Sequence, residues 1–206
     1  MRRPRPRRWR SVSGAWILTR NGSQVDLDVF SPSSISVLDV AAALSKINRF
    51  NGHTSRLYSV AEHSLHVVTV MERELHITDP GALYAGLLHD AHEAYVQDLS
   101  TPLKTLLGAE WASVERRAQI SVLQRFDALE HFMLHHSAIK VADLTMLATE
   151  RRDLMPATGP QWAVLRGVEP LPYFELSEFD AMECDDWRDA FIERFSELRQ
   201  AAKEQA

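Results

Sequence analysis

From residue 36 to the end of the chain, apolar residues recur at the three- and four-residue spacing that gives an α-helix one apolar face. Asp79 and Pro80 suit the first turn of one such helix, and Ser137 suits the N-cap of another. The predicted helices cover residues 36–50, 58–75, 79–96, 109–126, 137–155 and 177–204. Between the last two, residues 156–177 hold four prolines and are predicted to be a loop.

A short β-hairpin is predicted before the helices. Residues 16–28, WILTRNGSQVDLD, contain two short β-type runs around a turn at NGS. The chain shows no internal repeat and no linker between two cores. The sequence therefore predicts one mainly α domain over residues 13–206, with a small N-terminal β-hairpin and a basic arm at residues 1–12.

Charge is unevenly distributed along the chain. The first ten residues hold six of the 23 basic side chains, so the remaining 17 face 28 acidic ones. An acidic body gives no support for nucleic-acid binding, although the arginine-rich arm could contact nucleic acid. We interpret the arm as a disordered tail, because charge and proline oppose the burial that folding requires.

The sequence also predicts the cellular compartment. No apolar run approaches the roughly 20 residues that span a bilayer, and no apolar segment typical of a secretory signal follows the arginines. The single cysteine, Cys184, excludes an internal disulfide and fits a reducing compartment. It lies in the acidic segment MECDDW, which disfavours a thiolate, so we interpret it as inert. We expect a cytoplasmic protein with no membrane partner.

Histidines and carboxylates occur among apolar residues on three of the predicted helices. His89, Asp90 and Glu93 follow two leucines, His63 lies in SVAEHSLHV, and Asp143 lies in KVADLTML. Buried ionisable groups are costly unless they are paired or bind a metal. Imidazole nitrogens and carboxylate oxygens together suit a borderline or hard divalent ion. The pattern therefore indicates a metal site, with Glu93 one helical turn after His89.

The order of these residues, a histidine, then His89–Asp90, then an aspartate, resembles that of the HD-domain metal-dependent phosphohydrolases. Two groups are most similar: the bacterial HD-domain 5′-deoxynucleotidases and the phage-type HD-domain deoxynucleoside (dATP) triphosphohydrolases. The resemblance also includes INRF, VAEHS and HDxxExxxxDLSTPLK, and it covers about residues 36–155. The segments RFNGHTSRLYSVAEHS and ATERRDLM are more similar to the phage-type group. The resemblance implies an HD-domain helical bundle that forms a homo-oligomer.

The resemblance implies one divalent metal ion bound by His63, His89, Asp90 and Asp143. Cobalt, manganese, zinc, iron and magnesium are all compatible with these ligands, and a second Mg²⁺ could accompany the substrate phosphates. Such a metal would acidify a bound water and direct it at the α-phosphorus.

The same resemblance gives roles to neighbouring side chains. Glu93 would hold or deprotonate the attacking water. Asp98 would protonate the departing 5′ oxygen, which requires a raised pKa that a neighbouring carboxylate can supply.

Cations and an aromatic side chain complete the predicted substrate site. Arg49 would bind phosphate oxygens bidentately, and Lys104 would supply a second positive charge. His53 and Arg56, in NGHTSR, would contact further phosphates of a triphosphate. Phe50 would stack on the base or sugar.

The predicted reaction is hydrolysis of the 5′-phosphoester of 2′-deoxynucleotides. The extra positive groups in NGHTSR favour a deoxynucleoside triphosphate such as dATP, giving deoxynucleoside and triphosphate. The alternative substrate is a deoxynucleoside monophosphate. The rival functions are a dinuclear HD phosphodiesterase, a nucleic-acid-binding protein acting through its arm, and a nucleotide sensor without catalysis, against which Glu93 and Asp98 argue.

The remaining histidines allow more than one interpretation. His131, His135 and His136 lie between the HD pair and the final aspartate, where dinuclear relatives carry extra ligands, but the preceding segment is turn-like. His66 and His92 lie three residues after His63 and His89. They could support the metal ligands, but we interpret them as residues on a helix surface.

Overall fold

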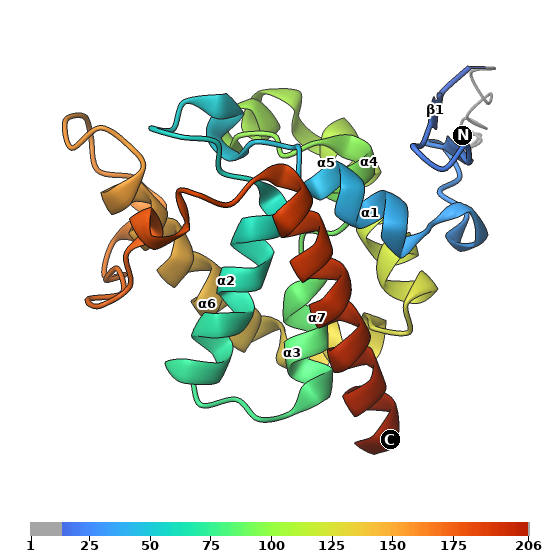
Figure 1. Ribbon diagram of the computed structural model, residues 1–206. Coiled ribbons are helices and arrows are strands. Elements are labelled where there is room, and N and C mark those ends of the chain that lie inside the picture. Colours follow the sequence, from blue (N-terminus) through green and yellow to red (C-terminus); the bar gives the residue numbers. More distant parts are fainter. Residues whose placement is uncertain (1–13, 206) are drawn as a thin grey trace, which may run out of the picture.

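The computed structural model describes residues 14–205, which form mainly helices with a small antiparallel hairpin (Figure 1). The predicted fold class is therefore confirmed, while the arginine-rich arm lies outside the described residues. The α-helices are α1 (Val37–Leu44), α2 (Val60–Arg73), α3 (Pro80–Leu87), α4 (Glu93–Val96), α5 (Thr101–Arg125), α6 (Leu129–Asp153) and α7 (Cys184–Gln205). Short 3₁₀-helices are η1 (Pro32–Ser34), η2 (Arg49–Gly52), η3 (Ala163–Leu165) and η4 (Leu176–Phe179).

The hairpin forms where the sequence predicts it. Strand β1 (Trp16–Leu18) pairs antiparallel with β2 (Gln24–Asp26), so that Ile17 lies opposite Val25. Gly22, in the connecting turn, has a φ of 81°, which glycine adopts without strain.

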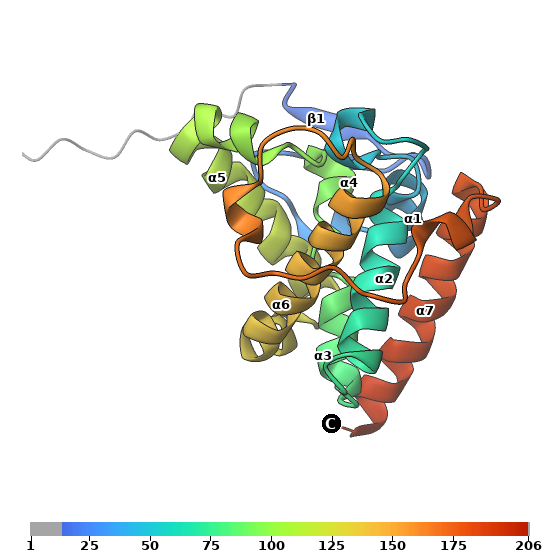
Figure 2. The same cartoon turned by 90° about the vertical axis from the view of Figure 1, so that its left-hand side faces the viewer.

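Helix α3 packs against α2, α6 and α7 (Figures 1 and 2). Its sequence, PGALYAGL, is rich in small residues, and every position after Pro80 is buried. A Cβ atom at Gly86 would clash with the sulfur of Met71 on α2, and one at Gly81 would clash with the His131 ring on α6. The small residues of α3 thus allow both neighbouring helices to approach closely. As predicted, Asp79 caps α3 by accepting a hydrogen bond from the Gly81 N–H.

The predicted helix over residues 79–96 is wrong as one continuous element. Helix α3 ends at Leu87, and residues 88–92 form turns before α4 begins at Glu93. In a regular helix, the Gly86 carbonyl would accept from the N–H four residues later. Here it accepts from the His89 ring nitrogen Nδ1 at 2.8 Å. A side chain that takes a backbone acceptor competes with the helix, which explains why His89 and Asp90 lie on a turn.

Other helix boundaries also differ from the predictions. Helix α6 begins at Leu129, so Ser137 lies inside it and is not an N-cap. Helix α5 begins at Thr101 and is interrupted at Gly108, whose φ of 66° and ψ of −145° are not helical. The predicted first helix stops at Leu44, and the last predicted helix divides into η4 and α7. Within residues 14–205, no helix combines the length and apolarity needed to cross a membrane.

Candidate metal centre

Helix α2 places His63 one turn inside its N-terminus. The N-cap residue Ser59 accepts a hydrogen bond from the Glu62 N–H at 3.1 Å, which fixes the first turn. His63 follows directly and is fully buried. An imidazole in this position needs a polar partner for each ring nitrogen, because burial without one is costly.

Glu150 on α6 is the partner of one His63 nitrogen. Its Oε1 lies 2.5 Å from His63 Nδ1 and 2.9 Å from the Tyr58 hydroxyl, while its Oε2 accepts two bonds from Arg49, each of 3.2 Å. Burial acts to raise the pKa of Glu150, but Arg49 and His63 lower it to about 2. An ionised carboxylate only accepts, so His63 Nδ1 carries a proton and the Nε2 lone pair points away from Glu150.

His89 is oriented in the same way by a backbone group. Its Nδ1 donates to the Gly86 carbonyl, which leaves Nε2 as the free acceptor. This Nε2 lies 3.3 Å from His63 Nε2 and 3.1 Å from Asp90 Oδ2. The three donor atoms lie within 4.8 Å of one another, so His63, His89 and Asp90 could hold a metal ion.

The chemistry of these donors fits a cation between them. When both rings are neutral and each Nδ1 carries the proton, two imidazole lone pairs and a carboxylate oxygen converge. Metal-bound histidines typically donate their other ring N–H to a carboxylate or carbonyl, as both do here. In the metal-free protein His63 carries a second proton in place of the metal. Burial and Arg49 lower the pKa of His63, but Glu150 and Asp143 raise it to about 9.

Asp143 and Arg49 border this donor set. Asp143 Oδ1 lies 3.3 Å from His63 Nε2, and its Oδ2 accepts a 2.7 Å bond from Lys140. Arg49 Nη1 lies 3.7 Å from Asp90 Oδ2, and the residue is only 7% exposed. Burial acts to raise the pKa of Asp90, but His89, His63 and Arg49 hold it well below its usual range. The centre is therefore ionised, and it combines metal donors with a buried guanidinium.

Glu93 and Asp98 lie close to Asp90. Glu93 is the first residue of α4, and Asp98 follows the end of that helix. Glu93 is 3% exposed, and its Oε2 has no hydrogen-bond partner among residues 14–205. Burial, together with Asp90 and Asp98, raises its pKa well above the usual range. Burial and Asp90 also raise the pKa of Asp98, although Arg49 and Lys104 oppose them. Burial thus favours the neutral form of both carboxyl groups over what is usual for exposed ones.

Like Arg49, which is paired with Glu150, the predicted phosphate-binding cations Lys104 and Arg56 have carboxylate partners. Lys104 forms a 2.6 Å ion pair with Glu115 on the same helix. Arg56 forms ion pairs with Glu62 at 2.6 Å and Asp180 at 2.7 Å. It also donates to the Leu176 carbonyl, so the guanidinium joins α2 to the segment around η4.

The other two predicted substrate residues are Phe50 and His53. Phe50 lies in η2, and His53 follows the last residue of η2. Phe50 packs against Trp162, with ring centroids 5.7 Å apart. His53 is exposed at the end of η2.

His131, His135 and His136 lie away from the centre. They belong to the first turns of α6, where His135 Nε2 lies 2.9 Å from Asp79 Oδ2. Asp79 precedes α3 and His89 follows it, and an eight-residue helix is about 12 Å long. This placement separates the three histidines from His63, His89 and Asp90.

The interpretation of His66 and His92 as surface residues is wrong, because each is only 4% exposed. His66 packs against Phe174, Phe179 and Trp187. Burial lowers the pKa of His92 to about 4, so it is neutral at physiological pH.

Comparison with known proteins gives a family. No protein-family model matches the chain. The uncharacterized protein YfdR of Escherichia coli (strain K12) is 34% identical over 189 residues, which cover 92% of this chain and 98% of YfdR. The chain belongs to the YfdR family. An uncharacterized protein of Rhodobacter capsulatus is 36% identical over 118 residues, covering 54% of this chain and 58% of that protein.

Sequence reasoning missed two residues in the centre of this YfdR-family chain. Glu150 and Tyr58 were given no role, yet both are fully buried: Glu150 accepts from His63 Nδ1, and the Tyr58 hydroxyl donates to Glu150. One signal was available for Glu150. It lies seven residues after Asp143, and a spacing of seven residues returns to the same face of a helix.

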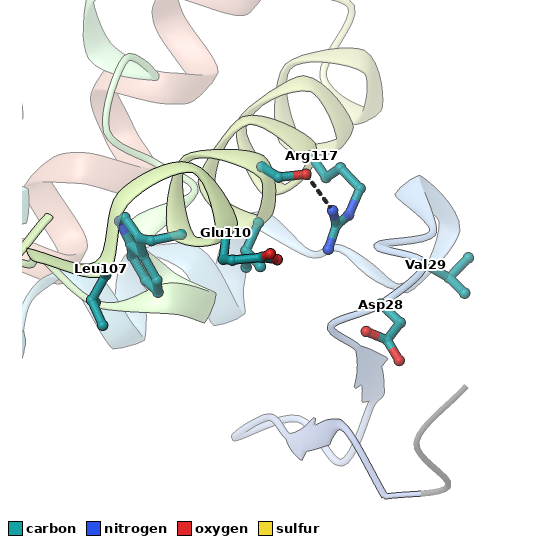
Figure 3. Close-up of a pocket in the computed structure, with 8 residues that line it drawn as sticks. Asp28, Val29, Leu107, Glu110 and Arg117 are labelled. Atoms are coloured by element: carbon teal, nitrogen blue, oxygen red, sulfur yellow. Dashed lines mark hydrogen bonds between the residues drawn. The ribbon is translucent and has the colours of Figure 1, made fainter. Parts of the chain in front are cut away.

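A cavity of about 610 Å³ in this YfdR-family chain lies apart from the centre, between the end of the hairpin and α5 (Figure 3). Asp28 and Val29 lie on one side of it, and Leu107, Glu110 and Arg117 on the other. None of the predicted ligands lines it, so the cavity is separate from the candidate metal site.

Proposed function

We propose that the chain is a metal-dependent phosphohydrolase that cleaves the 5′-phosphoester of 2′-deoxynucleotides. The observation that carries this proposal is the convergence of His63 Nε2, His89 Nε2 and Asp90 Oδ2 beside the buried Arg49 guanidinium. Convergent acceptors suit a divalent cation, and a guanidinium suits a phosphate oxygen. The order of these residues, which resembles that of the HD-domain phosphohydrolases, supports the same conclusion.

Asp143 is the proposed fourth ligand, because its Oδ1 is directed at the same His63 nitrogen. When bound, a divalent ion would acidify a water and polarise the phosphate. Glu150 keeps the Nε2 lone pair of His63 available through the bond to Nδ1, and the Gly86 carbonyl does the same for His89.

Glu93 and Asp98 are the proposed proton carriers. Glu93 is buried beside Asp90 without a hydrogen-bond partner in the described chain, so its free oxygen is available to a water. Asp98, whose pKa is raised by burial and by Asp90, can hold the proton that the departing 5′ oxygen needs. Two neighbouring carboxyl groups titrate as a pair, which favours one protonated and one ionised member.

A deoxynucleoside monophosphate is the favoured substrate. The sequence favours a triphosphate because NGHTSR adds positive groups, but Arg56 is paired with Glu62 and Asp180. Lys104 is likewise paired with Glu115. Breaking these pairs to bind the outer phosphates would cost interactions that a monophosphate leaves intact. The exposed His53 is what supports the triphosphate as a second candidate.

The test is a screen of all deoxynucleoside mono- and triphosphates with Mn²⁺, Co²⁺, Mg²⁺, Zn²⁺ and Fe²⁺. Chromatography measures the deoxynucleoside, and a colorimetric assay measures orthophosphate. A monophosphatase yields the two in equal amounts. A triphosphohydrolase yields deoxynucleoside from a triphosphate, with orthophosphate only after a phosphatase is added. Metal and nucleotide binding without deoxynucleoside from any substrate would refute the hydrolase and leave the sensor.

A further inference from the structure

Trp162 lies in the loop after α6 and forms an aromatic pair with Phe50. The two ring centroids are 5.7 Å apart and the ring planes are tilted by 35°. The Arg49 guanidinium lies 5.5 Å from the Phe50 ring, and the Arg151 guanidinium lies 5.4 Å from the Trp162 ring. Both rings are half-buried, so each keeps part of its surface open to solvent.

The backbone ties this pair directly to the metal centre. Arg49 and Phe50 are consecutive, as are Glu150 and Arg151, and consecutive Cα atoms are about 3.8 Å apart. Arg49 and Glu150 bond to each other inside the centre, while Phe50 and Arg151 both contact Trp162. Phe50 therefore lies one residue from the centre, and Trp162 contacts Arg151, which lies one residue from the centre on a second chain segment.

The conformation of η2 supports a functional role for Phe50. Phe50 has φ 55° and ψ 29°, and Asn51 has φ 54° and ψ 27°. Both residues lie in the left-handed region, which side-chain-bearing residues rarely adopt. Consecutive strained residues concentrate at ligand-binding sites, where the fold holds them in place. Here the strain accompanies the contact between Phe50 and Trp162.

We propose that Trp162 and Phe50 bind the nucleobase of the substrate between their rings, which makes Trp162 a substrate-binding residue. The proposal rests on the proposed function, because the base follows from a nucleotide substrate whose phosphate lies at the metal centre. Stacking on both faces recognises any planar base and needs no hydrogen bonds to its edges. The ligand class is thus a nucleobase joined to a 5′-phosphorylated sugar.

Insertion of a base requires the rings to separate. Atoms in contact lie about 3.5–4.0 Å apart, so two rings around a base are roughly 7–8 Å apart. The present distance is 5.7 Å, and the Trp162 ring is the one placed to move, because it belongs to an irregular loop. Arg151 anchors that loop by donating to the carbonyls of Pro156 and Thr158.

The experiment compares dAMP with 2-deoxyribose 5-phosphate, which keeps the phosphate and sugar but lacks the base. Trp162→Ala should raise KM for dAMP about tenfold, because it removes one of the two rings that stack on the base. It should leave hydrolysis of the sugar phosphate unchanged, and Trp162→Phe should restore most of the loss. The matched control is Tyr173→Ala, because Tyr173 is an aromatic residue 96% exposed in a nearby segment.

Two results would overturn the proposal. An equal loss on both substrates would mean that Trp162 only maintains the fold of the site. The double variant Phe50→Ala/Trp162→Ala gives the second test. If the rings hold opposite faces of the base, the double variant should bind dAMP more weakly than either single variant, whereas a double variant no weaker than Phe50→Ala alone would make Trp162 a positioning residue.

A binding measurement separates this proposal from the proposed function. Where the protein does not hydrolyse dAMP, calorimetric titration of the Mn²⁺-loaded protein with dAMP reports its affinity. If the wild type hydrolyses neither substrate but Trp162→Ala still weakens dAMP binding about tenfold, the hydrolase is refuted and the nucleobase site stands. Unchanged dAMP affinity in Trp162→Ala would refute the nucleobase site.

Discussion

Replacing Glu150 with glutamine tests how the metal centre is built. Glu150 accepts four hydrogen bonds and donates none: Oε1 accepts from His63 and Tyr58, and Oε2 accepts two from Arg49. Glutamine has nearly the same shape, but one oxygen becomes an NH₂ group. Turned one way, the NH₂ group faces the two donors of Arg49; turned the other way, it faces the Nδ1–H of His63. In both cases the charge opposite Arg49 is lost.

The expected loss of stability is large for so small a change. Hydrogen bonds to charged groups contribute about 1.5–3 kcal/mol each, and breaking a buried ion pair costs about 3–5 kcal/mol. We therefore expect Glu150→Gln to lower the free energy of unfolding by roughly 3–5 kcal/mol in the absence of metal. We also expect a 10- to 100-fold loss of metal affinity, because partners that orient a ligating histidine have effects of about that size.

Urea unfolding in a chelating buffer, followed by circular dichroism, measures the first effect, and calorimetric titration with Mn²⁺ measures the second. Glu130→Gln is the matched control, because Glu130 is exposed near the start of the same helix. It should change stability by no more than about 0.5 kcal/mol. A Glu150→Gln protein with wild-type stability and wild-type Mn²⁺ affinity would refute the reasoning. A loss of stability alone would show that Glu150 supports the fold without orienting His63.

Four further predictions concern the centre and the arm. His63→Ala or Asp90→Ala should abolish Mn²⁺ binding by calorimetry and nearly all deoxynucleotide hydrolysis; retained binding would exclude that residue as a ligand. Glu93→Ala should keep Mn²⁺ affinity but lower kcat about 10²- to 10⁴-fold, and full activity would refute its role. In the metal-free protein the proton on His63 stabilises the fold below about pH 6.5, and this effect is lost as pH rises through about 9. Metal displaces that proton, so Mn²⁺ affinity should rise about tenfold per pH unit up to about pH 9, and a flat titration between pH 6 and 8 would contradict this. Deleting residues 1–10 should leave turnover unchanged, whereas loss of the main activity would favour a role for the arm.

The predictable parts of the molecule are those that local sequence determines. Helical spacing located most of the helices, and Asp79 and Pro80 predicted the start of α3 correctly. His63, His89 and Asp90 could be proposed as metal ligands because each occurs in an apolar segment. Burial of such a residue is costly without a partner, and that cost is visible in the sequence alone.

The parts that could not be predicted depend on contacts between distant segments. Glu150 lies 87 residues from the His63 nitrogen that it orients, and no local pattern records that contact. The break after Leu87 depends on the His89 ring taking the Gly86 carbonyl, which helical spacing does not reveal. The sequence predicts that Arg56 is available to a phosphate, because one of its actual partners, Asp180, is far along the chain.

The charge balance of the centre bears on the choice of substrate. Asp90, Asp143 and Glu150 are ionised, and Arg49 is the cation that lies among them. A divalent ion would offset much of this negative charge, and a phosphate monoester then adds a charge of roughly −1.5 to −2. A triphosphate adds more, although the pairing of Arg56 and Lys104 leaves neither cation free to meet it. The same carboxylates that suit a metal ion thus make the monophosphate the less costly substrate to bind.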